Sequence, residues 1–172
     1  HRGHFLSDDL SRQLGTLALL PQIKRAVRVP VIAAGGIADA AGLAAAMALG
    51  ADGVQVGTAY LLCREATTSP VHRAALQSEA AVHTALTNVF TGRPARGIVN
   101  RVMRELGPLR AAPHPAFPRT TAALAPLRAA AEARGSDDFS PLWSGQNNTG
   151  CRAVPAAELT RALCRRFQGP EE

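Results

Sequence analysis

Two stretches of sequence, VPVIAAGGI at residues 29–37 and GADGVQVGT at residues 50–58, decide the fold. Each contains a short apolar run that ends on glycine, at Gly35 and Gly36 in the first stretch and at Gly57 in the second. A continuous apolar run bounded by glycines is typical of a strand buried on both faces, as in a parallel sheet. We therefore predict strands over residues 29–34 and 53–56.

The segment between these strands has the features of a connecting helix. Asp39 can cap a helix over residues 40–49, which is rich in alanine and ends before Gly50. Strand, helix and strand within roughly 30 residues form the crossover unit that joins parallel strands in α/β folds. A helix over residues 16–28, with Thr16 as its N-cap, is predicted before the first strand and implies a further strand upstream of His1.

After Leu62 the pattern changes and predicts a second, mainly helical part. Ser69 and Pro70 are typical of a helix start, and residues 84–90 have strand character. Further helices are predicted over about 100–106, 120–134 and 155–167, with the proline-rich residues 107–119 as a tether. We therefore divide the chain into residues 1–66 and residues 67–172.

Composition narrows the class of protein. The 172 residues are 47% hydrophobic and 19% charged, as expected of a globular protein, and no uninterrupted apolar run reaches the ~18 residues of a membrane span. Three cysteines without a CxxC pair indicate a reducing compartment, so we expect a cytoplasmic protein. The net charge is +6, but the arginines are scattered and aromatic residues are only 4%, so neither nucleic acid nor membrane is expected as a partner.

The two strand ends are the best candidates for a binding site. Ligands of parallel α/β proteins bind at the carboxyl ends of strands, where glycines let backbone N–H groups approach a phosphate. Thr58 can add a hydroxyl, and the helix that follows Asp39 adds its positive end. One Gly-Gly pair alone indicates only a tight turn, but two such ends on consecutive strands favour a phosphate site.

The same stretches resemble the last two barrel strands of the nitronate monooxygenases, formerly called 2-nitropropane dioxygenases. The opening His1-Arg2-Gly3 resembles the end of a family segment that contains the catalytic histidine. Residues 86–97, with their TGRPARG core, and the WSGQ of residues 143–146 match as well. The resemblance spans nearly the whole chain, and it implies the C-terminal part of a (β/α)₈ TIM barrel followed by a helical subdomain.

This resemblance also implies a cofactor and a reaction. Six residues would bind FMN, chiefly its phosphate: Gly35, Gly36, Gln55, Val56, Gly57 and Thr58. His1 would lie over the flavin, either as the base that deprotonates a nitroalkane or as the group that positions the nitronate. The flavin would oxidise the nitronate with O₂ to a carbonyl compound and nitrite, and Gln146 would lie near the mouth of the active site. No metal is expected, because His1, His4 and Asp8 or Asp9 match no standard ligand spacing.

Three alternatives to this interpretation remain open. A flavin-dependent enoyl-acyl-carrier-protein reductase shares the two strand ends and would use NAD(P)H. A non-catalytic fragment is the second alternative, and tight turns without a ligand are the third. Because two parallel strands cannot close a barrel, we expect this chain alone to bind FMN poorly and to be inactive unless a second polypeptide completes the barrel.

Overall fold

The computed structural model describes residues 9–109, 115 and 117–165, so His1, His4 and Asp8 lie outside the described residues. Contacts divide the chain into two compact units. The first, here called the βα unit, consists of residues 11–67 and those from Asn147 onward. The second, here called the hairpin unit, consists mainly of residues 68–146. Each unit is described by itself.

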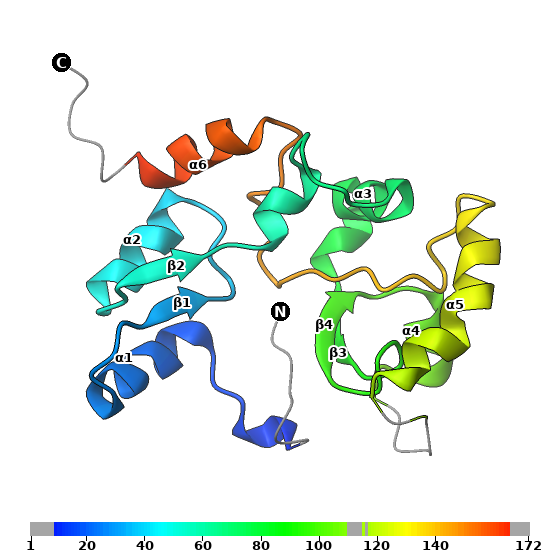
Figure 1. The fold of residues 1–172 in the computed structure, drawn as a ribbon, viewed down its shortest axis with the longest axis horizontal. Coiled ribbons are helices and arrows are strands. Elements are labelled where there is room, and N and C mark those ends of the chain that lie inside the picture. The colour runs from blue at the N-terminus through cyan, green and yellow to red at the C-terminus, as the bar shows by residue number, and fades with distance from the viewer. Residues whose placement is uncertain (1–8, 110–114, 116, 166–172) are drawn as a thin grey trace. The chain divides into compact units, whose positions relative to one another are not determined.

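The βα unit contains the predicted crossover (Figure 1). A short 3₁₀ turn, η1 (Leu10–Arg12), lies at the boundary between the units. The elements of the βα unit are α1 (Thr16–Ala26), β1 (Ile32–Ala34), α2 (Ala40–Ala48), β2 (Gly53–Gln55), the 3₁₀ helix η2 (Thr58–Leu62) and α6 (Ala156–Cys164). Strands β1 and β2 pair in parallel, with Ile32 opposite Gly53 and Ala34 opposite Gln55. This confirms the two predicted strands and the helix that connects them.

Within the described residues, only one face of this strand pair is buried, whereas the sequence predicts a strand buried on both faces. The side chain of Ala33 is 4% exposed and packs among the helices, whereas Ile32 is 56% exposed. Val29, just before β1, is 64% exposed. Alternate residues of a strand point to opposite faces, so the face that carries Ile32 has no cover within the described residues of this unit. The apolar run therefore includes side chains on a second face of the strand, and the described residues of this unit do not cover that face.

The start of α1 also differs from the prediction. Gly15, not Thr16, is the N-cap residue, and no side chain caps the helix. Thr16 instead donates its hydroxyl hydrogen to the carbonyl oxygen of Ala34 at 3.1 Å. A threonine hydroxyl can satisfy either a helix end or a neighbouring strand, and here the contact lies 18 residues away in sequence. Thr16 therefore joins α1 to the carboxyl end of β1.

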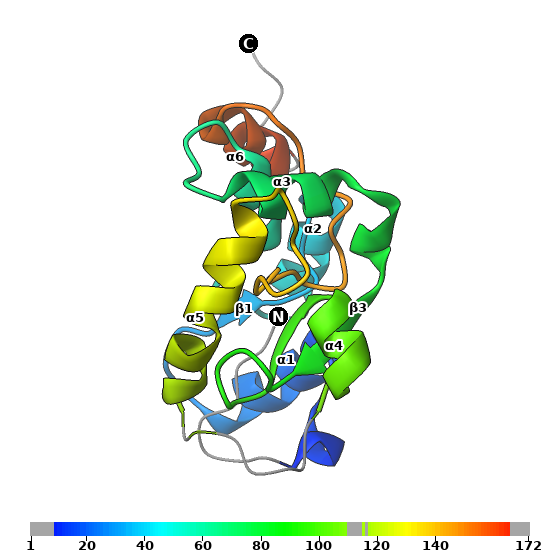
Figure 2. The same ribbon diagram turned by 90° about the vertical axis from the view of Figure 1, so that its right-hand side faces the viewer.

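Helix α6 completes the core of the βα unit. Figure 2 shows α6 beside α2, and the two helices are in contact. Leu159 and Leu163 are 1% and 4% exposed and pack with Leu43 and Ala46 of α2. Burial of one leucine stabilises a fold by roughly 1.5–3 kcal/mol. By their contacts, the residues from Asn147 onward belong to the βα unit, and the division at residue 66 stays a prediction.

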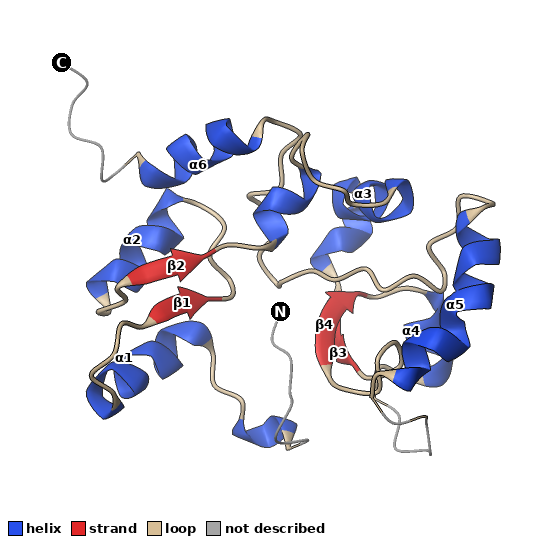
Figure 3. Cartoon of the chain, in the orientation of Figure 1, coloured by secondary structure: helices blue, strands red, loops and turns tan. Residues whose placement is uncertain are grey.

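The hairpin unit contains a two-stranded antiparallel sheet among helices (Figure 3). Its elements are α3 (Pro70–Gln77), the 3₁₀ helix η3 (Glu79–Val82), β3 (Thr84–Thr87), β4 (Ala95–Ile98), α4 (Arg101–Leu106) and α5 (Arg119–Glu132). Ser69 caps α3 as predicted, since its hydroxyl oxygen accepts a hydrogen bond from the His72 N–H. The predicted helices at residues 100–106 and 120–134 correspond to α4 and α5.

Residues 142–144 extend this sheet along its β4 edge. Gly97 forms a β-bridge with Trp143, the Ile98 N–H donates to the Leu142 carbonyl at 2.8 Å, and the Ser144 N–H donates to the Arg96 carbonyl at 3.2 Å. These bonds bring the Trp143 side chain against Phe90 in the core of the hairpin unit. No helix in the described part of the chain is long and apolar enough to cross a membrane.

Candidate functional site

The carboxyl ends of β1 and β2 lie together at one edge of the strand pair. Because the strands are parallel and Ala34 pairs with Gln55, the residues that follow each strand leave the sheet side by side. Gly35 and Gly36 follow β1, and residues 56–58 follow β2. The structure therefore brings together the two glycine-containing ends that the sequence singled out.

Both ends offer space for a ligand close to the backbone. Gly35 and Gly36 have φ angles of 102° and 78°, which L side chains rarely adopt, so glycine is required there. A Cβ atom at Gly36 or Gly57 would have no atom within 4 Å. Within the described residues, the N–H groups of Gly36 and Gly57 donate no hydrogen bond. N–H groups without a partner in the described residues are the kind of donor that a phosphate group needs.

The positive end of α2 adds less to this edge than the sequence indicates. Asp39 occupies the N-cap as predicted, and its carboxylate accepts a hydrogen bond from the Gly42 N–H at 2.7 Å. That carboxylate already balances part of the helix dipole. An anion at this edge would therefore depend mainly on the loop N–H groups and on the Thr58 hydroxyl, which lies at the start of η2.

A segment from the far end of the chain, residues 147–151, packs against both strand ends. The Asn147 side-chain amide donates to the Gly36 carbonyl at 3.1 Å, and the Cys151 thiol donates to the Thr58 carbonyl at 3.2 Å. Between these two contacts, Gly150 lies so close to the Ala38 carbonyl that a Cβ atom would overlap it. Nothing in the local sequence predicts these contacts, which join residues more than ninety positions apart.

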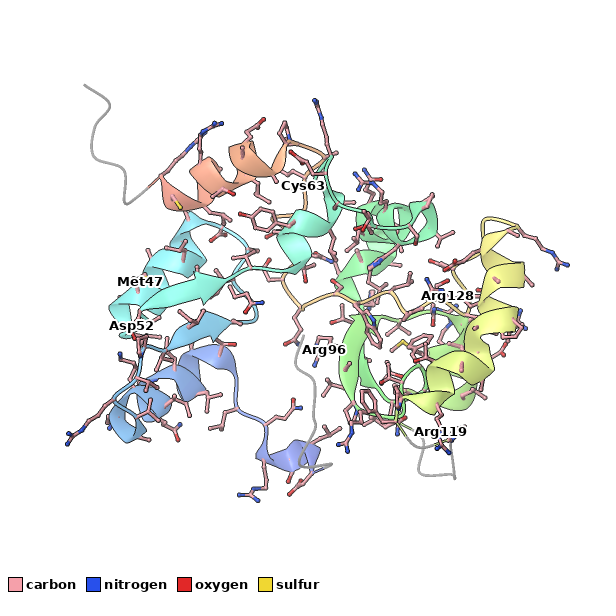
Figure 4. All side chains as sticks on the ribbon, viewed as in Figure 1. Met47, Asp52, Cys63, Arg96, Arg119 and Arg128 are labelled. Atoms are coloured by element: carbon pink, nitrogen blue, oxygen red, sulfur yellow. The ribbon has the colours of Figure 1, made fainter. Side chains whose placement is uncertain are left out.

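The Cys151 thiol is a stable donor in this arrangement. Burial raises its pKa from 9.0 to about 11, and the nearby Cys63 adds to the rise. The thiol is therefore protonated at neutral pH, as donation to the Thr58 carbonyl requires. Cys63 itself is 1% exposed and fills the core at the end of η2 (Figure 4).

The opposite end of the strand pair has a structural role. Asp52 lies at this end (Figure 4). Lys24 Nζ pairs with Asp52 Oδ2 at 2.7 Å, and the Val31 N–H donates to the same oxygen at 2.7 Å. These contacts lower the pKa of Asp52, the Lys24 hydrogen bond most and the Val31 hydrogen bond next. In parallel barrels this amino-terminal end of the strands serves stability, whereas the carboxyl end carries the chemistry.

Two other residues were predicted to belong to the site, and their roles stay predictions. His1 lies outside the described residues. Gln146, which was expected near the mouth of the active site, belongs to the hairpin unit and is exposed. The residues that contact the strand ends are Asn147 and Cys151, which follow Gln146 in sequence.

Known proteins match this chain in sequence over nearly all of its length. A sequence model of the nitronate monooxygenase family covers residues 1–166. A nitronate monooxygenase of Pseudomonas aeruginosa is 41% identical over 98% of this chain and 48% of its own length. One from Paraburkholderia phytofirmans is 43% identical over 98% of this chain and 46% of its own length. The chain thus spans about half the length of these curated relatives.

Solved structures give the same result. A nitroalkane oxidase from Streptomyces ansochromogenes superimposes with a TM-score of 0.85 at 41% identity, over 94% of this chain and 46% of its own. FabK from Thermotoga maritima superimposes with a TM-score of 0.69 at 28% identity, over 90% of this chain and 49% of its own. The βα unit is therefore part of a (β/α)₈ barrel, and the chain belongs to the nitronate monooxygenase family.

Proposed function

We propose that the carboxyl ends of β1 and β2 bind the phosphate of FMN in an enzyme that oxidises nitronates or nitroalkanes. The observation that carries this proposal is the pair of unbonded N–H groups at Gly36 and Gly57, side by side at adjacent parallel strand ends. The φ angles of Gly35 and Gly36 and the open space beside Gly57 fit a phosphate group held by backbone donors. Membership of the nitronate monooxygenase family supports the proposal that this phosphate is the phosphate group of a flavin.

Each residue of the site has a distinct part in this proposal. The N–H groups of Gly36 and Gly57 and the Thr58 hydroxyl would hold the phosphate, while Gln55 and Val56 would lie along the cofactor. Thr16, Asn147 and Cys151 would act indirectly, since each donates to a carbonyl of the strand-end backbone and so fixes its direction. They are positioning residues and not ligands.

In this proposal FMN carries out the redox step and His1 carries out the proton transfer. FMN supplies the redox chemistry that converts a nitronate and O₂ to a carbonyl compound and nitrite. His1 would act as the base that removes the α-proton of a nitroalkane, because the unperturbed pKa of an imidazole is about 6.5 and therefore close to a neutral working pH.

The test of this function uses the full-length protein with FMN. We expect nitrite release from propane-2-nitronate in the presence of O₂. Oxidation of NADH that depends on an enoyl thioester, without nitrite release, would instead identify the enoyl-acyl-carrier-protein reductase alternative. If a flavin-loaded protein shows neither of these activities, that result would support the non-catalytic alternative.

The 172-residue chain alone is expected to lose FMN on desalting. The face of β1 that carries Ile32 has no cover within the described βα unit, and the described strands of this unit are one parallel pair, so these residues do not supply the rest of a barrel around the strand ends. A visible absorption spectrum of the desalted chain measures this directly. Flavin bands at equimolar amount would contradict the expectation and would mean that the site assembles from these residues alone.

A further inference from the structure

The hairpin unit contains a pocket whose lining residues all belong to that unit. Its volume is about 240 Å³, below the roughly 300–1,000 Å³ of sites for drug-sized ligands. Phe90, Leu124, Phe139 and Trp143 are among its apolar walls, and Thr121 and Arg128 of α5 supply polar groups. A pocket of this size suits a ligand of few heavy atoms.

The apolar walls of this pocket are fixed by ring packing and by hydrogen bonds to the backbone. Phe90 is 3% exposed and meets Trp143 edge to face, with ring centroids 5.6 Å apart and planes at 85°. Trp143 is fixed through its backbone, since it bridges Gly97 and its carbonyl lies 3.0 Å from His72 Nε2. Thr121 donates its hydroxyl hydrogen to the Phe90 carbonyl at 3.0 Å, which ties α5 to the same wall. The pocket is therefore preformed.

Phe139 and Pro141 are positioned by a buried amide. The Asn100 side chain is 4% exposed, and its Nδ2 donates to the carbonyls of Asp137 and Ser140 at 2.8 and 2.9 Å. These two bonds fix the loop that carries the remaining apolar wall.

Arg128 places a cation at the rim of this apolar space. Its Nε donates to Glu132 Oε1 at 2.8 Å, and that oxygen also accepts from the Ser140 hydroxyl at 2.6 Å. The hydrogen bonds from Ser140 and Arg128 lower the pKa of Glu132, so this carboxylate is ionised and holds the guanidinium in one orientation. Within the described residues, Nη1 and Nη2 of Arg128 form no hydrogen bond. A guanidinium held at Nε keeps a second edge with which it can bind a two-oxygen group.

Arg128 is the charged residue that lines the pocket, whereas the Arg101 guanidinium lies 5.9 Å from the centroid of the Phe139 ring and pairs with Glu105. Burial lowers the pKa of His72, which is therefore neutral at neutral pH. The pocket thus combines an aromatic and aliphatic body with one oriented cation.

We propose that this pocket binds a small organic monoanion, with its branched or aromatic body against Phe90, Leu124 and Trp143 and its two-oxygen head group on the Nη edge of Arg128. Isobutyrate and benzoate are probes of this class, and each is small enough for the volume. The proposal does not rest on the proposed flavin chemistry, because binding of these carboxylates is measured without turnover and does not require FMN.

Trp143 provides the readout, because it is the one tryptophan in the sequence and lines the pocket. We expect isobutyrate to quench the fluorescence of Trp143 saturably, and calorimetry gives a second measurement of binding. Isobutyramide should bind at least about tenfold more weakly than isobutyrate, because a charged hydrogen-bond partner contributes more than a neutral one. Arg128→Gln is expected to weaken isobutyrate binding about tenfold or more. Arg128→Lys should keep only part of the wild-type affinity for isobutyrate, because lysine keeps the positive charge but not the planar guanidinium that can bind two oxygens at once.

The matched control is Arg119→Gln, which removes an exposed arginine from the other end of the same helix (Figure 4) and should leave binding unchanged. Circular dichroism of each variant checks that α5 remains folded. The comparison of isobutyrate with isobutyramide needs no variant, so a folding defect in Arg128→Gln does not remove the test. Equal affinity for the acid and the amide, equal affinity in Arg128→Gln, or no saturable binding would each overturn the proposal.

Discussion

Replacement of His1 with asparagine in the full-length protein is expected to slow the oxidation of neutral 2-nitropropane by about 10²–10⁴-fold, the usual contribution of a general base. The same variant should oxidise preformed propane-2-nitronate at close to the wild-type rate. The reason is that the nitronate has already lost the α-proton that His1 is proposed to remove. Asparagine keeps a hydrogen-bonding group of similar size but cannot take up a proton.

Nitrite release from the two substrates measures both rates in the same preparation. His83→Asn is the matched control, because His83 is exposed and lies outside the proposed site. An equal loss with nitroalkane and nitronate would show that His1 positions the anion and does not act as its base. No loss with either substrate would remove His1 from the reaction.

Gly150→Ala is expected to disrupt both the stability of the βα unit and its flavin site. A Cβ atom at Gly150 would overlap the backbone carbonyl oxygen of Ala38, which cannot move as a side-chain end can. Overpacking of this kind costs typically about 1–3 kcal/mol. To relieve the overlap, residues 147–151 must move away, and the contacts of Asn147 with Gly36 and of Cys151 with Thr58 would be lost with them.

Thermal unfolding and FMN affinity of the full-length protein test this prediction together. The melting temperature should fall by roughly 2–4 °C for each kcal/mol lost, and FMN should bind more weakly. Gly42→Ala is the matched control in the same unit, because a Cβ atom there has its nearest neighbour at 3.5 Å, an ordinary van der Waals contact, and alanine favours the interior of a helix, so the melting temperature should not fall. A Gly150→Ala variant with unchanged melting temperature and FMN affinity would show that residues 147–151 do not hold the strand ends.

The sequence predicts features that depend on neighbouring residues. The caps at Asp39 and Ser69, the strand predicted at residues 53–56 and observed at Gly53–Gln55, and the helices α4 and α5 each follow from a local pattern of capping residues, glycines and apolar spacing. The proximity of the two strand ends follows from their parallel pairing, which the crossover pattern indicates.

Features that depend on distant contacts were missed. Thr16 has the sequence of an N-cap, but its hydroxyl finds the Ala34 carbonyl. The apolar run before Gly35 does not reveal that Ile32 is exposed, since burial depends on what covers a face and not on the strand itself. The contacts of Asn147 and Cys151 with the strand ends join opposite parts of the chain, and single-sequence patterns carry no signal for them.

The affinity difference between FMN and riboflavin, measured in the full-length protein and in its Gly57→Val variant, tests the central claim most directly. The two ligands differ only by the phosphate, so their difference isolates the strand-end site. Gly57 has a φ angle of −110° and open space beside it, so valine fits the fold but fills the space proposed for the phosphate. We predict that FMN binds at least about tenfold more tightly than riboflavin in the wild type, as expected for charge-assisted hydrogen bonds, and that the difference disappears in Gly57→Val. An undiminished preference for FMN in the variant would place the phosphate elsewhere and contradict the proposed site.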